Sequence, residues 1–121
     1  MSTTDVGNGL VAKVRAGDND GARSAYYHKD IVSVEPIGNP REVKGIDACH
    51  KKGQQWVESM EVHSGTVEGP FVAGNHFAVR YIYDVTHKAS KQRMTLDEMA
   101  LYWVDGDKIV KEQFFYHMPG A

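Results

Sequence analysis

The fold is decided by the stretch Asp105-Gly-Asp-Lys-Ile-Val-Lys-Glu-Gln-Phe-Phe-Tyr116. Its Asp-Gly turn follows a strand-like run over residues 94–104 and leads into a second strand. Because side chains alternate along a strand, one face of this second strand carries Val110, Glu112, Phe114 and Tyr116. If this face points inward, Glu112 is a desolvated acid among apolar and aromatic neighbours. Such burial raises the pKa of a carboxyl and suits it to proton transfer or to ligand binding.

Length and composition indicate one small globular domain over residues 1–121, with roughly two thirds of its unfolded surface buried. The net charge of -2 comes from interspersed acids and bases, which argues against nucleic acid as a partner. Cys49 is the only cysteine, so an intrachain disulfide is excluded. Residues 1–8 lack the basic start and apolar core of a signal peptide, and no apolar run is long enough to span a membrane. We expect a soluble, cytoplasmic protein without a membrane partner.

Hydrophobic periodicity places helices in the first half of the chain and strands in the second. Helices are predicted over residues 5–15, from a cap at 18–20 to about 26, and over 45–59. In the last of these, Cys49 and Trp56 share an apolar stripe, and Lys51 and Lys52 are expected to face outward. A strand is predicted over residues 31–35, and about four more follow in a meander, with breaks at 69–70, 74–75, 87–92 and 105–107. This order predicts an α+β fold with the helices on one face of a curved antiparallel sheet.

Glu35 is the first candidate general base, because it ends an apolar strand directly before a proline and should be fixed near the mouth of a cavity. A solvated carboxylate at a strand end is the simpler alternative. Asp97 and Glu98 are neighbours in a strand, so only one of them faces the interior. If Met99 and Trp103 are internal, Asp97 joins them, and Glu98 pairs with Arg80 on the outside.

Carboxylates that converge in one apolar cavity cannot all ionise at neutral pH, so at least one would remain protonated and donate a hydrogen bond, with Glu35 as the base and Asp97 or Glu112 as the protonated donor. The strand over residues 77–85 has an aromatic face, which is expected to point inward. Most such residues form the core, and some could contact a ligand. The candidate ligand contacts are Tyr26, Tyr27, Trp56, Phe77, Tyr81, Met99, Trp103, Phe114 and Tyr116.

Known cofactor motifs are absent from the sequence. The six histidines show neither a His-x-His nor a His-Glu-x-x-His spacing, which argues against a metal site. No dinucleotide fingerprint, phosphate loop or Gly-x-Ser-x-Gly motif occurs. We therefore expect no cofactor.

Four segments carry a resemblance to a known family, namely residues 16–22, 34–38, 44–48 and 105–110. In their order and spacing the chain resembles the nuclear transport factor 2-like superfamily, in particular its polyketide-cyclase-like (SnoaL-like) and ketosteroid-isomerase branch. The resemblance covers nearly the whole chain. It implies a cone-shaped, cystatin-like barrel in which a strongly curved mixed or antiparallel sheet wraps around three N-terminal helices and encloses a ligand cavity.

The resemblance also implies roles for individual residues. Glu35 matches the carboxylate base of the isomerases, and the region of Asp97 matches their protonated aspartic acid in the oxyanion hole. Tyr116 matches an aromatic residue of the cavity, whereas Glu112 replaces an apolar one. Leu10 stands where the isomerases have the tyrosine of the oxyanion hole, and losing such a donor costs on the order of a hundredfold or more in rate. Tyr26 or Tyr27 is then the alternative donor.

Together, the residues and the resemblance favour a cofactor-free enzyme of cyclase or isomerase type that acts on a small apolar carbonyl compound by acid/base catalysis. A non-catalytic module for ligand binding or dimerisation, and a lyase or dehydratase, are the alternatives. The expected partner is a second copy of the chain, held through the outer face of the sheet with reciprocal Arg80 to Glu98 pairs. The residues expected on that face are Ala78, Arg80, Ile82, Glu98, Ala100 and Tyr102.

Overall fold

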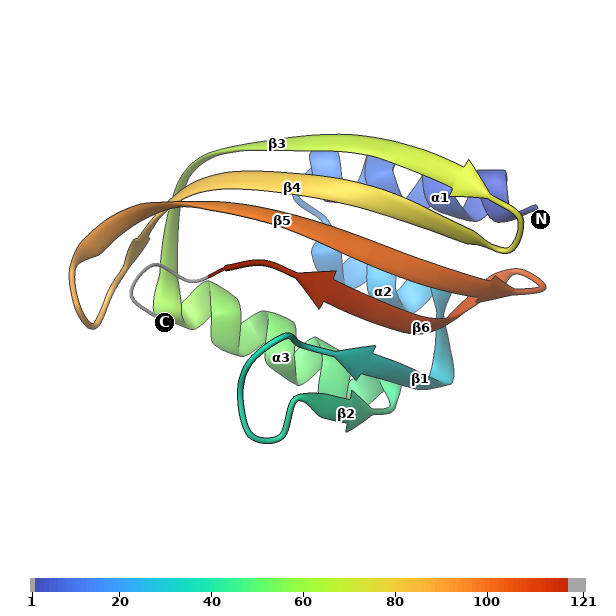
Figure 1. Ribbon diagram of the computed structural model, residues 1–121, viewed down its shortest axis with the longest axis horizontal. Coiled ribbons are helices and arrows are strands. Elements are labelled where there is room, and N and C mark those ends of the chain that lie inside the picture. The colour runs from blue at the N-terminus through green and yellow to red at the C-terminus, as the bar shows by residue number, and fades with distance from the viewer. Residues whose placement is uncertain (1, 118–121) are drawn as a thin grey trace.

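The computed structural model describes residues 2–117 and contains three helices and six strands (Figure 1). The helices are α1 (Thr3–Arg15), α2 (Asn19–Tyr26) and α3 (Ile46–Ser59). The strands are β1 (Tyr27–Val34), β2 (Glu42–Lys44), β3 (Met60–Ala73), β4 (His76–His87), β5 (Gln92–Asp105) and β6 (Lys108–Phe115). The predicted α+β class is confirmed.

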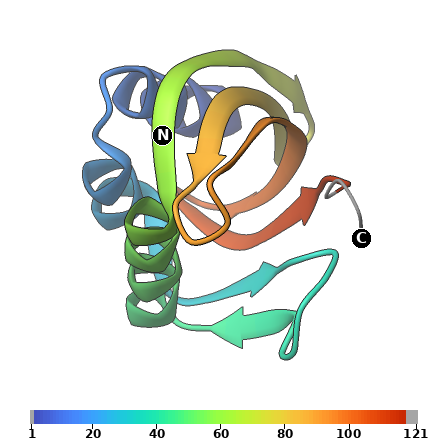
Figure 2. The ribbon, with the colours of Figure 1, turned by 90° about the vertical axis from the view of Figure 1, so that its left-hand side faces the viewer.

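The six strands form one mixed sheet in the order β2-β1-β6-β5-β4-β3. The β1–β6 pair is parallel and the other pairs are antiparallel. Figure 2 shows the sheet curling into an open cone, with the three helices on its concave side. The sheet therefore has one face turned to the helices and one face turned outward.

The helix ends are fixed by local polar contacts and by the sheet. Ser2 and Asp5 form a reciprocal capping box at the start of α1, and Asp18 caps α2 by accepting from the backbone N–H of Gly21 at 2.9 Å. At the other end of α1, Arg15 donates to the carbonyl oxygen of Val67 in β3 at 2.7 Å. The apolar stripe of α1 then packs into the core.

Two strand boundaries differ from the predictions. β1 begins at Tyr27, directly after α2, because its first residue already pairs with Ile109 of β6. β3 runs through Gly69 and Pro70, where a break was predicted, because the ladder to β4 shifts register there and resumes at Phe71. The edge strand β2 was not predicted, since three residues are too few to show a period.

The inner face of β5 is opposite to the predicted one. The ladder with β4 sets Glu98 against Tyr81 and Ala100 against Val79. Residues directly opposite one another in an antiparallel pair share a face, so Glu98 points inward with the buried Ala100. The outer face of β5 therefore includes Asp97, Met99, Leu101 and Trp103.

A bulge in β6 sets the direction of Glu112. Trp103 pairs with Lys111 and Val104 pairs with Ile109, so Val110 is an extra residue without a partner in β5. The prediction that Val110 shares the face of Glu112 is wrong. Because of this bulge, Ile109 and Glu112 are both buried, at 0% and 3% exposure.

The core lies between α1, α2 and the concave face of the sheet. Its largest members include Phe77, which stacks on Tyr102 with ring centroids 4.9 Å apart, and Leu10 of α1. Within residues 2–117, no helix has the length and apolarity that crossing a membrane requires.

Candidate active site

A continuous chain of polar contacts runs through the concave side of the sheet. We call it the interior network, and it consists of Tyr116, Glu35, Lys52, Ser33, Glu112 and Tyr27, in order of contact. The members come from β1 and the residue after it, from α3, and from β6 and the residue after it. Since β1 and β6 are parallel neighbours, the sheet topology brings together groups about eighty residues apart in sequence.

Glu112 is the buried end of the interior network. One of its carboxyl oxygens accepts a hydrogen bond from the Tyr27 hydroxyl, and the other accepts from Ser33 Oγ at 2.7 Å. Burial raises the pKa of Glu112, while the two hydrogen bonds and the nearby Lys52 ammonium act in the opposite direction. The prediction of an inward, desolvated Glu112 in an aromatic setting is confirmed.

Glu35 is the partly accessible end of the network. Its Oε1 lies 2.7 Å from Lys52 Nζ, and its Oε2 accepts a hydrogen bond from the Tyr116 hydroxyl at 2.9 Å. The side chains of Glu35 and Lys52 keep about a quarter of their exposure, at 23% and 26%. Glu35 is therefore a carboxylate with fixed orientation that a small molecule can still reach.

Lys52 joins the two carboxylates. Besides its ion pair with Glu35, its Nζ donates to Ser33 Oγ at 2.7 Å and lies 5.3 Å from the ring centroid of Phe114. The prediction that Lys52 faces outward is wrong. Lys52 follows the buried Cys49 by three residues and thus lies on the inner face of α3, where Glu35 compensates its charge.

Glu98, rather than Asp97, is the third carboxyl on the concave side. Burial raises its pKa to about 7, and the charges of Glu35 and Glu112 add to this effect. Asp97 lies on the outer face, where Arg80 donates to both of its oxygens at 3.0 and 2.7 Å and lowers its pKa. The expected Arg80 to Glu98 pair is therefore replaced by an Arg80 to Asp97 pair.

The predicted ligand contacts fall into three groups. Tyr27, Phe77 and Tyr81 are buried in the core, where the Tyr81 and Tyr102 hydroxyls lie 2.7 Å apart. Met99 and Trp103 lie on the outer face, with Met99 42% exposed and Lys111 Nζ 4.8 Å from the Trp103 ring.

The remaining predicted contacts are partly buried on the concave side of the sheet. Tyr116 and Phe114 touch the interior network directly through Glu35 and Lys52. Trp56 of α3 packs on Tyr83 of β4 with ring centroids 5.7 Å apart. The Tyr26 side chain instead packs toward α1. Tyr116 and Phe114 thus add aromatic surface beside the polar groups of the interior network.

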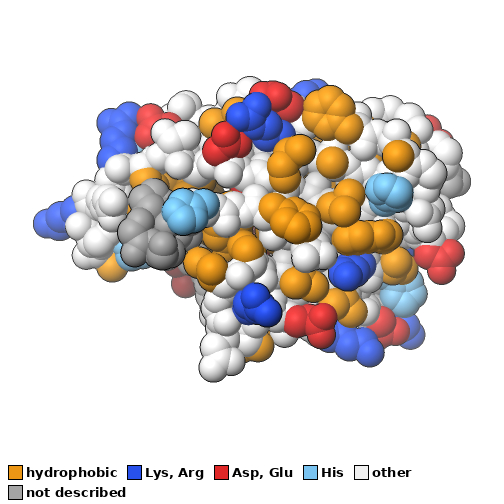
Figure 3. Space-filling model, viewed as in Figure 1, with side chains coloured by type: hydrophobic (Ala, Val, Ile, Leu, Met, Phe, Trp, Pro, Cys, Tyr) orange, Lys and Arg blue, Asp and Glu red, His pale blue; other side chains and the backbone are white. Residues whose placement is uncertain are grey.

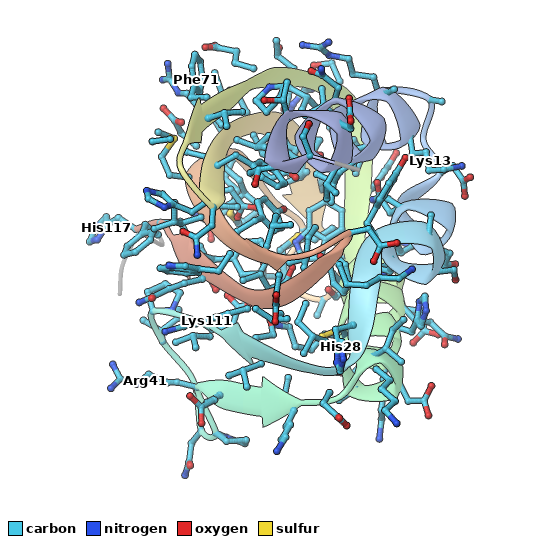
Figure 4. The ribbon with its side chains drawn as sticks, turned by 90° about the vertical axis from the view of Figure 1, so that its right-hand side faces the viewer. Lys13, His28, Arg41, Phe71, Lys111 and His117 are labelled. Carbon is cyan, nitrogen blue, oxygen red and sulfur yellow. The ribbon has the colours of Figure 1, made fainter. Side chains whose placement is uncertain are left out.

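An open groove of about 630 Å³ reaches the network from the rim of the sheet. It is lined by Val34, Glu35, Pro36, Pro40, Arg41, Glu42, Gln113, Phe114 and Phe115. Figure 4 shows Arg41 beside β2 and pointing outward. Glu35 and Phe114 thus belong both to this groove and to the surroundings of Lys52.

The site suits proton transfer. Glu35 pairs with the Lys52 ammonium, whose charge also acts on Glu98 and Glu112, and burial with the neighbouring carboxylates raises the pKa of Glu98 to about 7. Within the described residues, His, Cys, Asp and Glu side chains form no group of three or more that could hold a metal ion. The thiol of Cys49 is buried, and its pKa is raised to about 11, chiefly by burial.

Comparisons with known proteins agree with this architecture. A family model described as a SnoaL-like domain matches residues 1–116. A provisionally assigned SnoaL-like polyketide cyclase from Mesorhizobium loti is 41% identical, with a TM-score of 0.92 over 96% of this chain and 100% of that chain. No curated protein sequence matches the chain significantly.

More distant solved structures share the fold. A protein of Catenulispora acidiphila with a ketosteroid isomerase-like fold, solved in complex with trimethylamine, is 18% identical, with a TM-score of 0.73 over 92% of this chain and 84% of that chain. A protein of Xanthomonas campestris with a cystatin-like fold is 13% identical, with a TM-score of 0.79 over 98% of this chain and 92% of that chain. At these identities the likeness concerns the fold alone.

Proposed function

Because the chain belongs to the SnoaL-like family, within the nuclear transport factor 2-like superfamily, we propose that it is a small cofactor-independent enzyme of cyclase or isomerase type. Its substrate is a largely apolar molecule with an enolisable carbonyl group. Glu35 is the general base, and Glu98 takes the proton-donor role that was predicted for Asp97.

One observation carries this proposal. Glu35 is oriented by Lys52 and Tyr116, and Glu98, whose pKa is about 7, lies close enough for the two charges to interact. A base with fixed orientation beside an acid that titrates near neutrality is what proton transfer between two atoms of one substrate requires. Glu112 is less suited to this role, since both of its oxygens already accept hydrogen bonds.

A non-catalytic binding module is the second candidate, and it too has a supporting observation. That alternative predicts that Asp97 and Glu112 are satisfied by fixed partners. Arg80 holds Asp97, while Tyr27 and Ser33 hold Glu112. A lyase or dehydratase on the same scaffold would use the same base and acid.

Deuterium exchange distinguishes these candidates. A panel of apolar ketones is incubated with the protein in heavy water, and deuterium incorporation next to the carbonyl is followed by mass spectrometry. We expect incorporation that falls about a hundredfold or more in Glu35→Gln, the range that general base catalysis contributes. Tight binding of a ketone without incorporation would favour the module and overturn the enzyme proposal.

We also propose that the outer face of the sheet joins two copies of the chain. Figure 3 shows hydrophobic side chains gathered over this face. They include the exposed Phe71, Met99 and Phe115. A contiguous apolar surface of this kind usually marks an interaction site. The reciprocal Arg80 to Glu98 pair is not part of this proposal, because Glu98 points inward.

A further inference from the structure

In the proposed chemistry Glu98 supplies a proton, and a second group is needed to stabilise the charge that forms on the substrate oxygen. When a base removes a proton next to a carbonyl, the electrons of the C–H bond form a C=C bond and the carbonyl oxygen gains the negative charge. Leu10 is buried in the core and offers no donor. Of the two alternatives, the Tyr27 hydroxyl already donates a hydrogen bond to Glu112. The Tyr26 hydroxyl packs against α1, so close to Gly9 that a Cβ added there would lie 1.9 Å from the hydroxyl oxygen.

We infer that Lys52 is the residue that stabilises this oxygen, so that it is a catalytic group in the reaction proposed above. An ammonium group has three N–H donors. Among the described residues, Glu35 and Ser33 accept from two of them, each at 2.7 Å. One donor thus remains for a ligand beside the base. The inference rests on the proposed function, since it assigns a role within that reaction.

The charges explain why Lys52 would favour the transition state over the bound substrate. Before the reaction, its charge is paired with the Glu35 carboxylate. As Glu35 takes the proton it becomes neutral, while the substrate oxygen gains the same amount of negative charge. The Lys52 ammonium then exchanges its ion pair with Glu35 for one with the substrate oxygen, and the total charge of the site stays constant. An interaction that grows as the reaction proceeds lowers the barrier.

Ser33 and Phe114 keep the ammonium in place during this exchange. Ser33 Oγ accepts a hydrogen bond from Lys52 Nζ. Its hydroxyl in turn donates a hydrogen bond to Glu112, so the direction of both hydrogen bonds is fixed. Phe114 presents its ring to the ammonium and also lines the open groove that ends at Glu35. Because Glu35 and Phe114 both line the groove and both lie against Lys52 Nζ, a planar ligand in the groove contacts the base and lies near the ammonium.

The test uses p-nitrophenol, because its phenolate is a planar, delocalised oxyanion like an enolate. Binding is measured by calorimetry at a pH where the free phenol is ionised. Glu35→Gln imitates the neutral, protonated base, so it should bind the phenolate about tenfold or more tightly than the unaltered protein, as expected for a charged hydrogen bond. The gain should vanish when Lys52→Met or Lys52→Gln is added to Glu35→Gln.

Lys51→Met is the matched control, since Lys51 is the exposed neighbour on α3 and should leave the gain unchanged. Circular dichroism confirms that each variant is folded, and the two Lys52 variants guard against a local packing defect in one of them. The inference is overturned if the double variants keep the gain, or if no variant binds the phenolate. Failure of the proposed function itself would show separately, as absence of deuterium exchange in the unaltered protein.

Discussion

At the scale of single residues, Glu112 shows how an ionisable group is held in an apolar interior. Burial opposes its ionisation, and two hydrogen-bond donors and a nearby ammonium favour it. Of the two donors, Ser33 also accepts a hydrogen bond from Lys52, whereas the Tyr27 hydroxyl bonds only to Glu112 among the described residues. The pKa of Tyr27 is raised, chiefly by burial and next by the charge of Glu112. The hydroxyl therefore stays protonated and can donate a hydrogen bond to Glu112.

Tyr27→Phe should lower the free energy of unfolding by about 1–3 kcal/mol, because it leaves a buried carboxyl oxygen without its donor. Tyr26→Phe is the control, since the Tyr26 hydroxyl serves no buried acid, and it should change stability by less than about 0.5 kcal/mol. Urea unfolding of both variants measures the difference. Equal stability of the two variants would show that Glu112 does not depend on Tyr27.

Glu98 makes stability depend on pH. The pKa of Glu98 is about 7 in the folded protein and 4.5 as the ordinary value. Between these values the folded state binds more protons than the unfolded state, so stability should fall as the pH rises from about 4.5 to about 7, by at most about 3 kcal/mol. At pH 8, Glu98→Gln should therefore be more stable than the unaltered protein.

Unfolding measured between pH 4.5 and 8 checks this expectation. Glu61→Gln, at an exposed position of β3, is the control and should retain the pH dependence. If Glu98→Gln also retained the whole dependence, Glu98 would not be its source.

At the scale of secondary structure, three details separate the predicted site from the observed one. Glu112 could be predicted, because alternation within β6 holds beyond the bulge at Val110. Asp97 could not be placed, because Met99 and Trp103 look like core residues but belong to an apolar outer face. The inward position of Lys52 was not predicted, because a charged side chain is normally expected to be exposed to solvent. Its spacing of three residues from Cys49 nevertheless places it on the inner face of α3.

A substitution at Gly9 can test how closely α1 packs against α2. Alanine inside a helix is normally more favourable than glycine by about 0.5–1 kcal/mol. A Cβ at Gly9, however, would lie 1.9 Å from the Tyr26 hydroxyl oxygen and 2.4 Å from its Cζ. Gly9→Ala should therefore destabilise the protein by about 1–3 kcal/mol.

Thermal unfolding of Gly9→Ala in the unaltered background and in a Tyr26→Ala background checks this cause. The substitution should be harmful only where the tyrosine ring is present. A stabilising effect in the unaltered background would mean that α1 and α2 are not packed as closely as described.

At the scale of the whole molecule, the order of the elements carried most of the information about the fold. Helices in the first half and an alternating second half predict the α+β class, whereas the cone shape follows from the family resemblance, and the structure and the matched family agree with both. The interior network could not be predicted from the order of helices and strands. It depends on the parallel β1–β6 pair, which joins residues 33 and 112, and no local pattern reports such a distant pairing.

The outer face predicts the oligomeric state. Light scattering at micromolar concentration should show a dimer, and Met99→Lys, which puts a charge on the apolar surface, should give a monomer. Val57→Lys is the matched control, because Val57 is 58% exposed on α3, away from the sheet face. A monomer in the unaltered protein would remove the proposed interface.

In the proposed enzyme, the concave side of the sheet keeps a carboxyl group ready to exchange a proton at neutral pH. The most direct test is a titration of the glutamate side chains by carbon-13 NMR, with the Glu98 signal assigned from Glu98→Gln. We expect Glu98 to titrate near pH 7, as its burial beside Glu35 and Glu112 requires. A midpoint near the ordinary value of 4.5 would contradict the account.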